Sequence, residues 1–168
     1  MDMRDDSILF DGSPLDSFIA FQVSNLNMAL NIQSTAIIKQ LSTLSLTEWR
    51  VVSLIGSEPR STSGYLCKKA NMDKGLFSRR LKNLASEGYV AMCEDKEDHR
   101  LQHLRLTDKG QEVYDRVLPA MMKRQAYLEN TLNEQELASL FDILERLETA
   151  VANSMDQSKC TVCEDVAD

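Results

Sequence analysis

The sequence predicts a mainly α-helical protein with one small β-hairpin, an arrangement of the α+β class. Three observations predict it. Long stretches without proline or glycine carry apolar residues at helical spacing, as between residues 15 and 41. Two short β-prone runs enclose a charged tip at residues 96–100. Ser, Thr, Asp or Asn precedes several of the periodic apolar runs, as expected of helix N-caps.

The charge of the chain is distributed unevenly. The formal net charge of the 168 residues is −7. Residues 60–110 nevertheless contain 11 Lys and Arg against 7 Asp and Glu, net +4. The preceding segment has 3 cations and 7 anions, and the following segment has 5 and 12. A local cationic region of this kind attracts a nucleic-acid duplex, whereas the acidic remainder repels it.

The chain contains no run of 18 apolar residues, and its N-terminus lacks a basic segment followed by an apolar one. We therefore expect a soluble, cytoplasmic protein with no membrane partner. A flexible N-terminus is expected over residues 1–12. Ser13-Pro14-Leu15-Asp16 then has the residue types of a helix start. The helix that follows extends to about Leu41 and is about 40 Å long, more than one small domain needs, so part of it should pack on a partner.

The next helix is expected to begin with Thr47 as its N-cap and to end at Gly56. Trp49 is expected to anchor the long helix to the following domain, and lining a ligand cavity is the alternative. Arg50 could receive a carboxylate, although a solvated surface arginine is the simpler interpretation. A polar connector at residues 59–63 has room for a short strand beside the hairpin.

Residues 63–71 are expected to form a short helix, followed by a turn and a second helix from Asp73 to about Val90. Asp73 serves as N-cap of the second helix and Gly88 closes it. One face of this helix is apolar: Phe77, Leu81, Leu84 and Ala85. The opposite face is small or cationic: Gly75, Ser78, Arg79, Lys82 and Ser86. That face could approach a DNA backbone and base edges, and an ordinary solvated basic face is the alternative.

A β-hairpin follows, because Leu101, His103 and Arg105 alternate with Gln102, Leu104 and Leu106. Helix, turn, helix and hairpin in this order predict a winged helix-turn-helix whose second helix enters the major groove. The hypothesis places this DNA-binding domain at residues 46–107. Cys67 and Cys93 are expected to be small buried hydrophobic residues rather than members of a disulfide framework.

Two further helices complete the prediction. Thr107 caps the first, and Pro119 inside it is expected to cause a bend. Asn133-x-x-Glu136 opens the last, whose apolar stripe finds no place in the winged domain: Leu137, Leu140, Phe141, Leu144, Leu147 and Val151. Residues 13–45 and 108–155 are therefore predicted to form a helical dimerisation layer, followed by a mobile acidic tail at 156–168.

Several of these stretches resemble the MarR family of bacterial transcriptional regulators. The resemblance covers about residues 14–152 and rests on the run from Asp73 to Val90, on Asp98-x-Arg100 and on Leu106-Thr107-x-x-Gly110. It implies a homodimeric regulator, most often a repressor, in which a winged helix-turn-helix is joined to a helical dimerisation layer. It also implies an unidentified small-molecule effector that binds between the two and changes the spacing of the recognition helices.

The expected partners are double-stranded DNA, a second copy of the chain and that effector. The predicted DNA-binding residues lie on the second helix and at the hairpin tip: Lys74, Gly75, Leu76, Ser78, Arg79, Lys82, Lys96, Asp98, His99 and Arg100. At Gly75 and Leu76 the family more often has Ser or Thr. By resemblance, Asp98 braces the wing by pairing with Arg79 or Arg80. Arg100 at the hairpin suits the narrow minor groove.

No catalytic residue, metal site or cofactor is expected, because His99 and His103 do not combine with a nucleophile at any recognisable spacing. One alternative is a thiol- or metal-responsive regulator that senses through Cys160 and Cys163, whose CxxC spacing can chelate zinc or form a redox pair. Another is a winged helix that binds only proteins.

Overall fold

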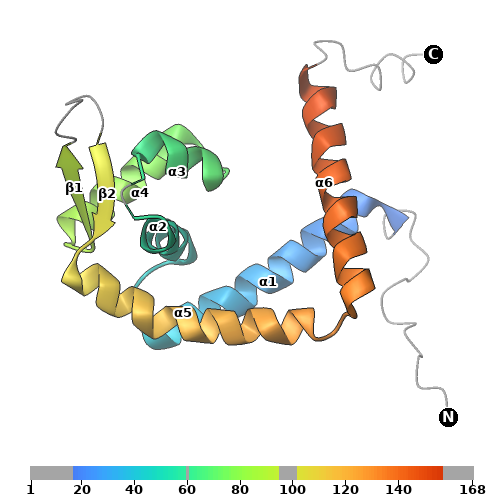
Figure 1. Ribbon diagram of the computed structural model, residues 1–168, viewed down its shortest axis with the longest axis horizontal. Coiled ribbons are helices and arrows are strands. Elements are labelled where there is room, and N and C mark those ends of the chain that lie inside the picture. The colour runs from blue at the N-terminus through green and yellow to red at the C-terminus, as the bar shows by residue number, and fades with distance from the viewer. Residues whose placement is uncertain (1–16, 60, 95–101, 157–168) are drawn as a thin grey trace. The chain divides into compact units, whose positions relative to one another are not determined.

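The computed structural model describes residues 17–59, 61–94 and 102–156. Figure 1 shows the elements that these residues form: α1 (Ile19–Leu41), α2 (Leu46–Ser57), α3 (Ser63–Lys69), α4 (Lys74–Ser86), β1 (Val90–Glu94), β2 (Gln102–Leu106), α5 (Asp108–Glu129) and α6 (Glu134–Asp156). The mainly α-helical class with one small sheet is confirmed. The chain divides into two compact units, one up to Met121 and one from Met122, and each is described by itself.

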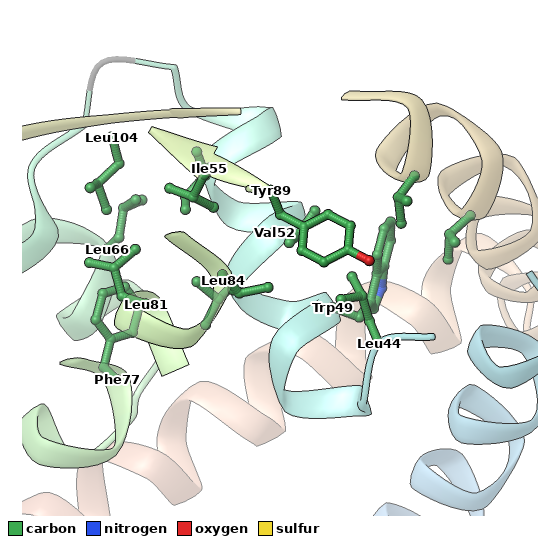
Figure 2. Close-up of a cluster of buried hydrophobic side chains, with 14 of the residues drawn as sticks. Leu44, Trp49, Val52, Ile55, Leu66, Phe77, Leu81, Leu84, Tyr89 and Leu104 are labelled. Atoms are coloured by element: carbon green, nitrogen blue, oxygen red, sulfur yellow. The ribbon is translucent and has the colours of Figure 1, made fainter. Parts of the chain in front are cut away.

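The core of the first unit is built around α2, which contacts α1, α3, α4 and β2. Figure 2 labels core side chains that come from α2, α3, α4, β2 and the loops before α2 and before β1: Leu44, Trp49, Val52, Ile55, Leu66, Phe77, Leu81, Leu84, Tyr89 and Leu104. Trp49 is buried, and its ring stacks on that of Tyr114 of α5 with 6.1 Å between the centroids. This ring contact joins α2 to α5, whereas the prediction named the long helix at residues 15–41 as the partner of Trp49.

The predicted ends of α2 are wrong at both termini. Ser45 is the N-cap, because its hydroxyl accepts the Glu48 N–H while the Glu48 carboxylate accepts the Ser45 N–H. Thr47 therefore lies inside the first turn. The helix continues past Gly56, where a Cβ would lie 2.6 Å from the Tyr114 ring. Glycine at this position allows α2 and α5 to approach closely.

The hairpin pairs β1 with β2 in antiparallel register from Val90 opposite Leu106 to Glu94 opposite Gln102. The short strand expected before α3 is a single bridge between Thr62 and His103. Cys67 is buried as predicted, but the prediction for Cys93 is wrong. Cys93 is exposed because it lies toward the tip of a two-stranded hairpin, where Met92 is exposed as well.

In the second unit, Asn133 and Glu136 form the predicted start of α6: each side chain accepts the backbone N–H of the other at 2.9 Å. The described side chains of α6 are all exposed or half-buried, including every residue of its apolar stripe. α5 continues through Pro119. The predicted helix start at residues 13–16 and the tail from residue 157 lie outside the described residues. None of the described helices is long and apolar enough to cross a membrane.

Candidate nucleic-acid interface

Helix α4 is positioned by caps at both ends and by one apolar face. The Asp73 carboxylate accepts the Leu76 N–H at 2.9 Å and thereby caps the N-terminus. Gly88 follows the C-terminus with φ +78°, a conformation that glycine adopts without strain. Phe77, Leu81 and Leu84 are buried against the core (Figure 2), so the orientation of the opposite face is determined. The structure confirms these three predicted features.

The opposite face of α4 is open to solvent. Of the residues predicted to contact DNA, the exposed ones on this helix are Lys74, Gly75, Ser78, Arg79 and Lys82. Leu76 is half-buried. The face therefore offers three cations, one hydroxyl group and one position without a side chain. Small residues beside long cations allow a helix backbone to lie close to a duplex while the cations reach phosphates or base edges.

Arg80 points toward the protein rather than away from it. Its Nη1 lies 3.4 Å from Glu48 Oε1 and so connects α4 to the start of α2. Burial alone would raise the pKa of Glu48, but hydrogen bonds from the Ser45 hydroxyl and N–H, together with the charge and hydrogen bond of Arg80, lower it below the ordinary value. Arg80 Nε is buried and has no hydrogen-bond partner among the described residues. Arg79, in contrast, is exposed.

The turn between α3 and α4 is tight. Asn71 adopts φ +48°, a left-handed conformation that Asn tolerates better than most residues. The Cys67 thiol donates to the Met72 carbonyl oxygen at 3.4 Å. The predicted helix over 63–71 therefore ends at Lys69, and the two remaining residues belong to the turn. This turn sets the angle at which α4 leaves α3.

The base of the hairpin is fastened to the start of α5. The Thr107 hydroxyl donates to the Gly88 carbonyl at 2.6 Å and accepts the Gly110 N–H at 3.1 Å, which also confirms Thr107 as a cap. Lys109 Nζ donates to the Glu87 carbonyl at 2.7 Å and lies 4.0 Å from the centre of the Tyr89 ring. The Thr107-x-x-Gly110 pattern thus connects the end of α4 to α5.

Two cations near α4 were not predicted as site residues. Lys68 is exposed on α3, and Arg105 is exposed on β2, where its Nε donates to Cys93 Sγ at 3.3 Å. The sequence signal for these two cations was the excess of Lys and Arg over Asp and Glu in residues 60–110. Arg50, the candidate carboxylate receptor, is exposed and donates to Asn31 of α1 at 2.8 Å.

The hairpin tip carries the remaining predicted contacts, Lys96, Asp98, His99 and Arg100, which lie outside the described residues. Cys160 and Cys163 lie outside them as well. Within the described part of the chain, no group of three or more His, Cys, Asp or Glu side chains could hold a metal ion.

Known proteins resemble this chain in sequence and in fold. The model of the MarR family matches residues 42–101, the segment that contains α2 to β1. The HTH-type transcriptional regulator YdgJ of Bacillus subtilis is 25% identical over 138 residues, which are 80% of each chain.

Two solved structures have the same fold. A MarR/EmrR family transcriptional regulator from Acinetobacter is 27% identical, with a TM-score of 0.72 over 80% of this chain and 94% of that one. A point mutant of MarR from E. coli, complexed with operator DNA, is 20% identical, with a TM-score of 0.67 over 88% and 99% of the two chains. These matches extend the similarity beyond the segment that the family model covers.

Proposed function

We propose that the chain is a MarR-family transcriptional regulator that acts as a homodimer and represses transcription by binding a pseudo-palindromic operator. The relatives reported above are named as transcriptional regulators, and the chain is a regulator rather than an enzyme. In this proposal α4 is the recognition helix, residues 46–107 form the DNA-binding domain, and the cytoplasm is the site of action.

The observation that carries the proposal is the geometry of α4. Its apolar face is buried in the core, and its opposite face presents Lys74, Arg79 and Lys82 to solvent. In helix-turn-helix proteins, a helix with one buried apolar face and one exposed polar face enters the major groove. Its exposed residues near the N-terminus contact the bases. The E. coli protein with the same fold was crystallised with operator DNA, which supports the same use of the fold here.

The dimer is supported by apolar residues that remain exposed on α1 and α6. On α1, Ile19, Leu26 and Ile32 are each at least 60% exposed. On α6, Phe141 is 57% and Val151 is 60% exposed. Large apolar residues that remain exposed along a helix are typical of interaction surfaces. We propose that residues 13–45 and 108–155 form a dimer interface of more than about 2,000 Å² in total.

We also propose that a small-molecule effector modulates DNA binding, as the family resemblance implies. The second candidate mode of regulation uses Cys160 and Cys163 as a thiol or metal sensor. The two modes are separated by measuring DNA binding of the full chain and of a chain truncated at Asp156, each treated with a thiol oxidant or zinc. If the effector proposal is correct, the two treated proteins should bind DNA equally. A response confined to the full chain would favour the sensor instead.

The proposed function is tested by gel-shift with genomic fragments. The wild-type protein should select a small number of fragments and bind them far more tightly than random DNA. Arg79→Ala together with Lys82→Ala should abolish this selection without changing the melting temperature, because both side chains are exposed. Arg50→Ala with Lys69→Ala removes the same charge from exposed positions of α2 and α3, outside the proposed dimer interface, and should retain the selection. A protein that selects no fragment at low salt would contradict the proposal.

A further inference from the structure

A pocket of about 420 Å³ lies between α3 and the N-terminal part of α4. Eight residues line it: Ser63, Gly64, Cys67, Lys68, Asn71, Met72, Lys74 and Phe77. Cys67 and Phe77 are buried and Met72 is half-buried, so they provide an apolar floor. The exposed part of the lining consists of Gly64, Lys68, Asn71 and Lys74. The two lysines and the asparagine make it polar.

The chemistry of this lining suits an oxyanion. It contains two lysines and no carboxylate among the eight described residues, and it adds the hydroxyl of Ser63 and the amide of Asn71 as further donors. Asp73 is the nearest acidic residue in sequence, but its carboxylate caps α4 by accepting the Leu76 N–H. Cationic and neutral donors of this kind are the groups that bind phosphates in protein–DNA contacts.

The position of the pocket indicates where the phosphate comes from. Lys74 lines the pocket and also belongs to the exposed face of α4 that the proposed function places at the major groove. Phosphates border the major groove along its whole length, and most contacts that position a protein on DNA are made to them. The apolar floor would contact the deoxyribose that adjoins such a phosphate.

We propose that this pocket seats a phosphate of the operator backbone, held by Lys68 and Lys74 with Ser63 and Asn71 as neutral donors. The inference rests on the proposed function and adds Lys68, Ser63 and Asn71 to its contacts. A free phosphate ion shares the same chemistry, and the experiments below distinguish the two sources.

The first experiment compares Lys68→Ala with Lys69→Ala. The two lysines are adjacent and equally charged, but Lys69 does not line the pocket; it pairs with Glu58 and lies 5.9 Å from the Tyr65 ring centre. Lys68→Ala should weaken binding to operator and random DNA by the same factor and reduce the slope of log affinity against log salt by about one. Lys69→Ala should leave that slope unchanged. Equal slopes for the two variants would overturn the proposal.

The second experiment blocks the pocket. A Cβ at Gly64 would meet nothing within 4 Å, so Gly64→Ala should preserve the fold, and Gly64→Gln should do so too because Gln favours helices. Gly64→Gln places a long side chain at the pocket and should lower DNA affinity several-fold, whereas Gly64→Ala should not. If both variants bind DNA like the wild type while remaining folded, no phosphate occupies this pocket.

The third experiment identifies the source of the phosphate with operator duplexes that carry one neutral methylphosphonate at a time. One position should weaken wild-type binding but not further weaken Lys68→Ala, which locates the contact. If inorganic phosphate binds the protein in a Lys68-dependent manner but no duplex position shows this coupling, the site belongs to a free ion and the proposal fails. Failure of the wild type to select any operator would instead reject the proposed function.

Discussion

Gly110 allows the hairpin base and α5 to meet. A Cβ at this position would collide with the carbonyl oxygen of Tyr89, which is backbone and cannot rotate away. The same carbonyl accepts the Thr107 N–H at 3.1 Å, so any shift also disturbs the junction between α4 and α5. The glycine of the Thr107-x-x-Gly110 pattern is therefore explained by a close approach of two backbones rather than by contact with DNA.

We predict that Gly110→Ala lowers the free energy of unfolding by about 3 kcal/mol, the upper part of the range for overpacked sites. Gly64→Ala is the matched control, because it replaces a helical glycine with open space around it. It should stabilise the protein slightly, by about 0.5–1 kcal/mol. Urea unfolding of both variants tests this, and a Gly110→Ala protein as stable as the wild type would contradict it.

At the hairpin tip we predict that removing a cation and removing an acid both lower DNA affinity, for different reasons. Arg100→Ala should lower affinity and flatten the preference for A·T-rich flanks, because an arginine in the narrow minor groove is lost. Asp98→Ala should also lower affinity, although it removes an acid near DNA, because the proposed brace to Arg79 or Arg80 is lost. Binding of each variant to one operator at several salt concentrations tests this. Tighter binding by Asp98→Ala, or wild-type binding by Arg100→Ala, would contradict the wing assignment.

Two single residues show why predictions were wrong, and only the second depends on more than a local sequence pattern. Thr47 and Ser45 are both good N-caps, and the decision between them comes from Glu48, which completes a capping box only with Ser45. The expected burial of Cys93 rests on its place in a predicted strand, but membership of a strand does not determine burial. The exposure of Cys93 depends on how far the hairpin extends beyond the core, and a strand prediction carries no information about that.

At the scale of elements, the helices with strong caps could be predicted best. The sequence placed the caps of α4 and α6 correctly, because Asp73, Gly88 and the Asn133–Glu136 pair act within one turn of the chain. The link between α2 and α4 through Glu48 and Arg80 joins residues 32 positions apart, and no local pattern reports it. Sequence could likewise show that Arg79 and Arg80 are adjacent, but not that only Arg79 is exposed.

The Glu48–Arg80 link leads to a prediction about pH. Because the pKa of Glu48 is lowered in the folded protein, its carboxylate contributes stability above the ordinary pKa of glutamate, and this contribution disappears as pH falls through the lowered value. Glu48→Gln should therefore destabilise the protein at neutral pH, and the difference from the wild type should shrink toward about pH 3. Urea unfolding at both pH values measures it. A difference that stays constant with pH would show that the charge of Glu48 does not matter.

For the whole molecule, the central question is how the exposed apolar residues of α6 are covered. We predict that Leu144→Asp dissociates or unfolds the protein, because an unpaired charge in an apolar interface is costly. Asn153→Asp is the control, since it adds the same charge to an exposed polar position of the same helix. Sedimentation at micromolar concentration should show a wild-type dimer and an Asn153→Asp dimer. A stable, folded wild-type monomer would remove the basis for the dimer.

A hydroxyl-radical footprint of the wild-type protein on its operator tests whether a symmetric dimer contacts two half-sites. A symmetric dimer with one α4 helix in each of two major grooves should protect two half-sites whose centres are about 10 base pairs apart, and a duplex with only one half-site should bind far more weakly. One protected half-site, bound as tightly alone as within the full operator, would contradict the account.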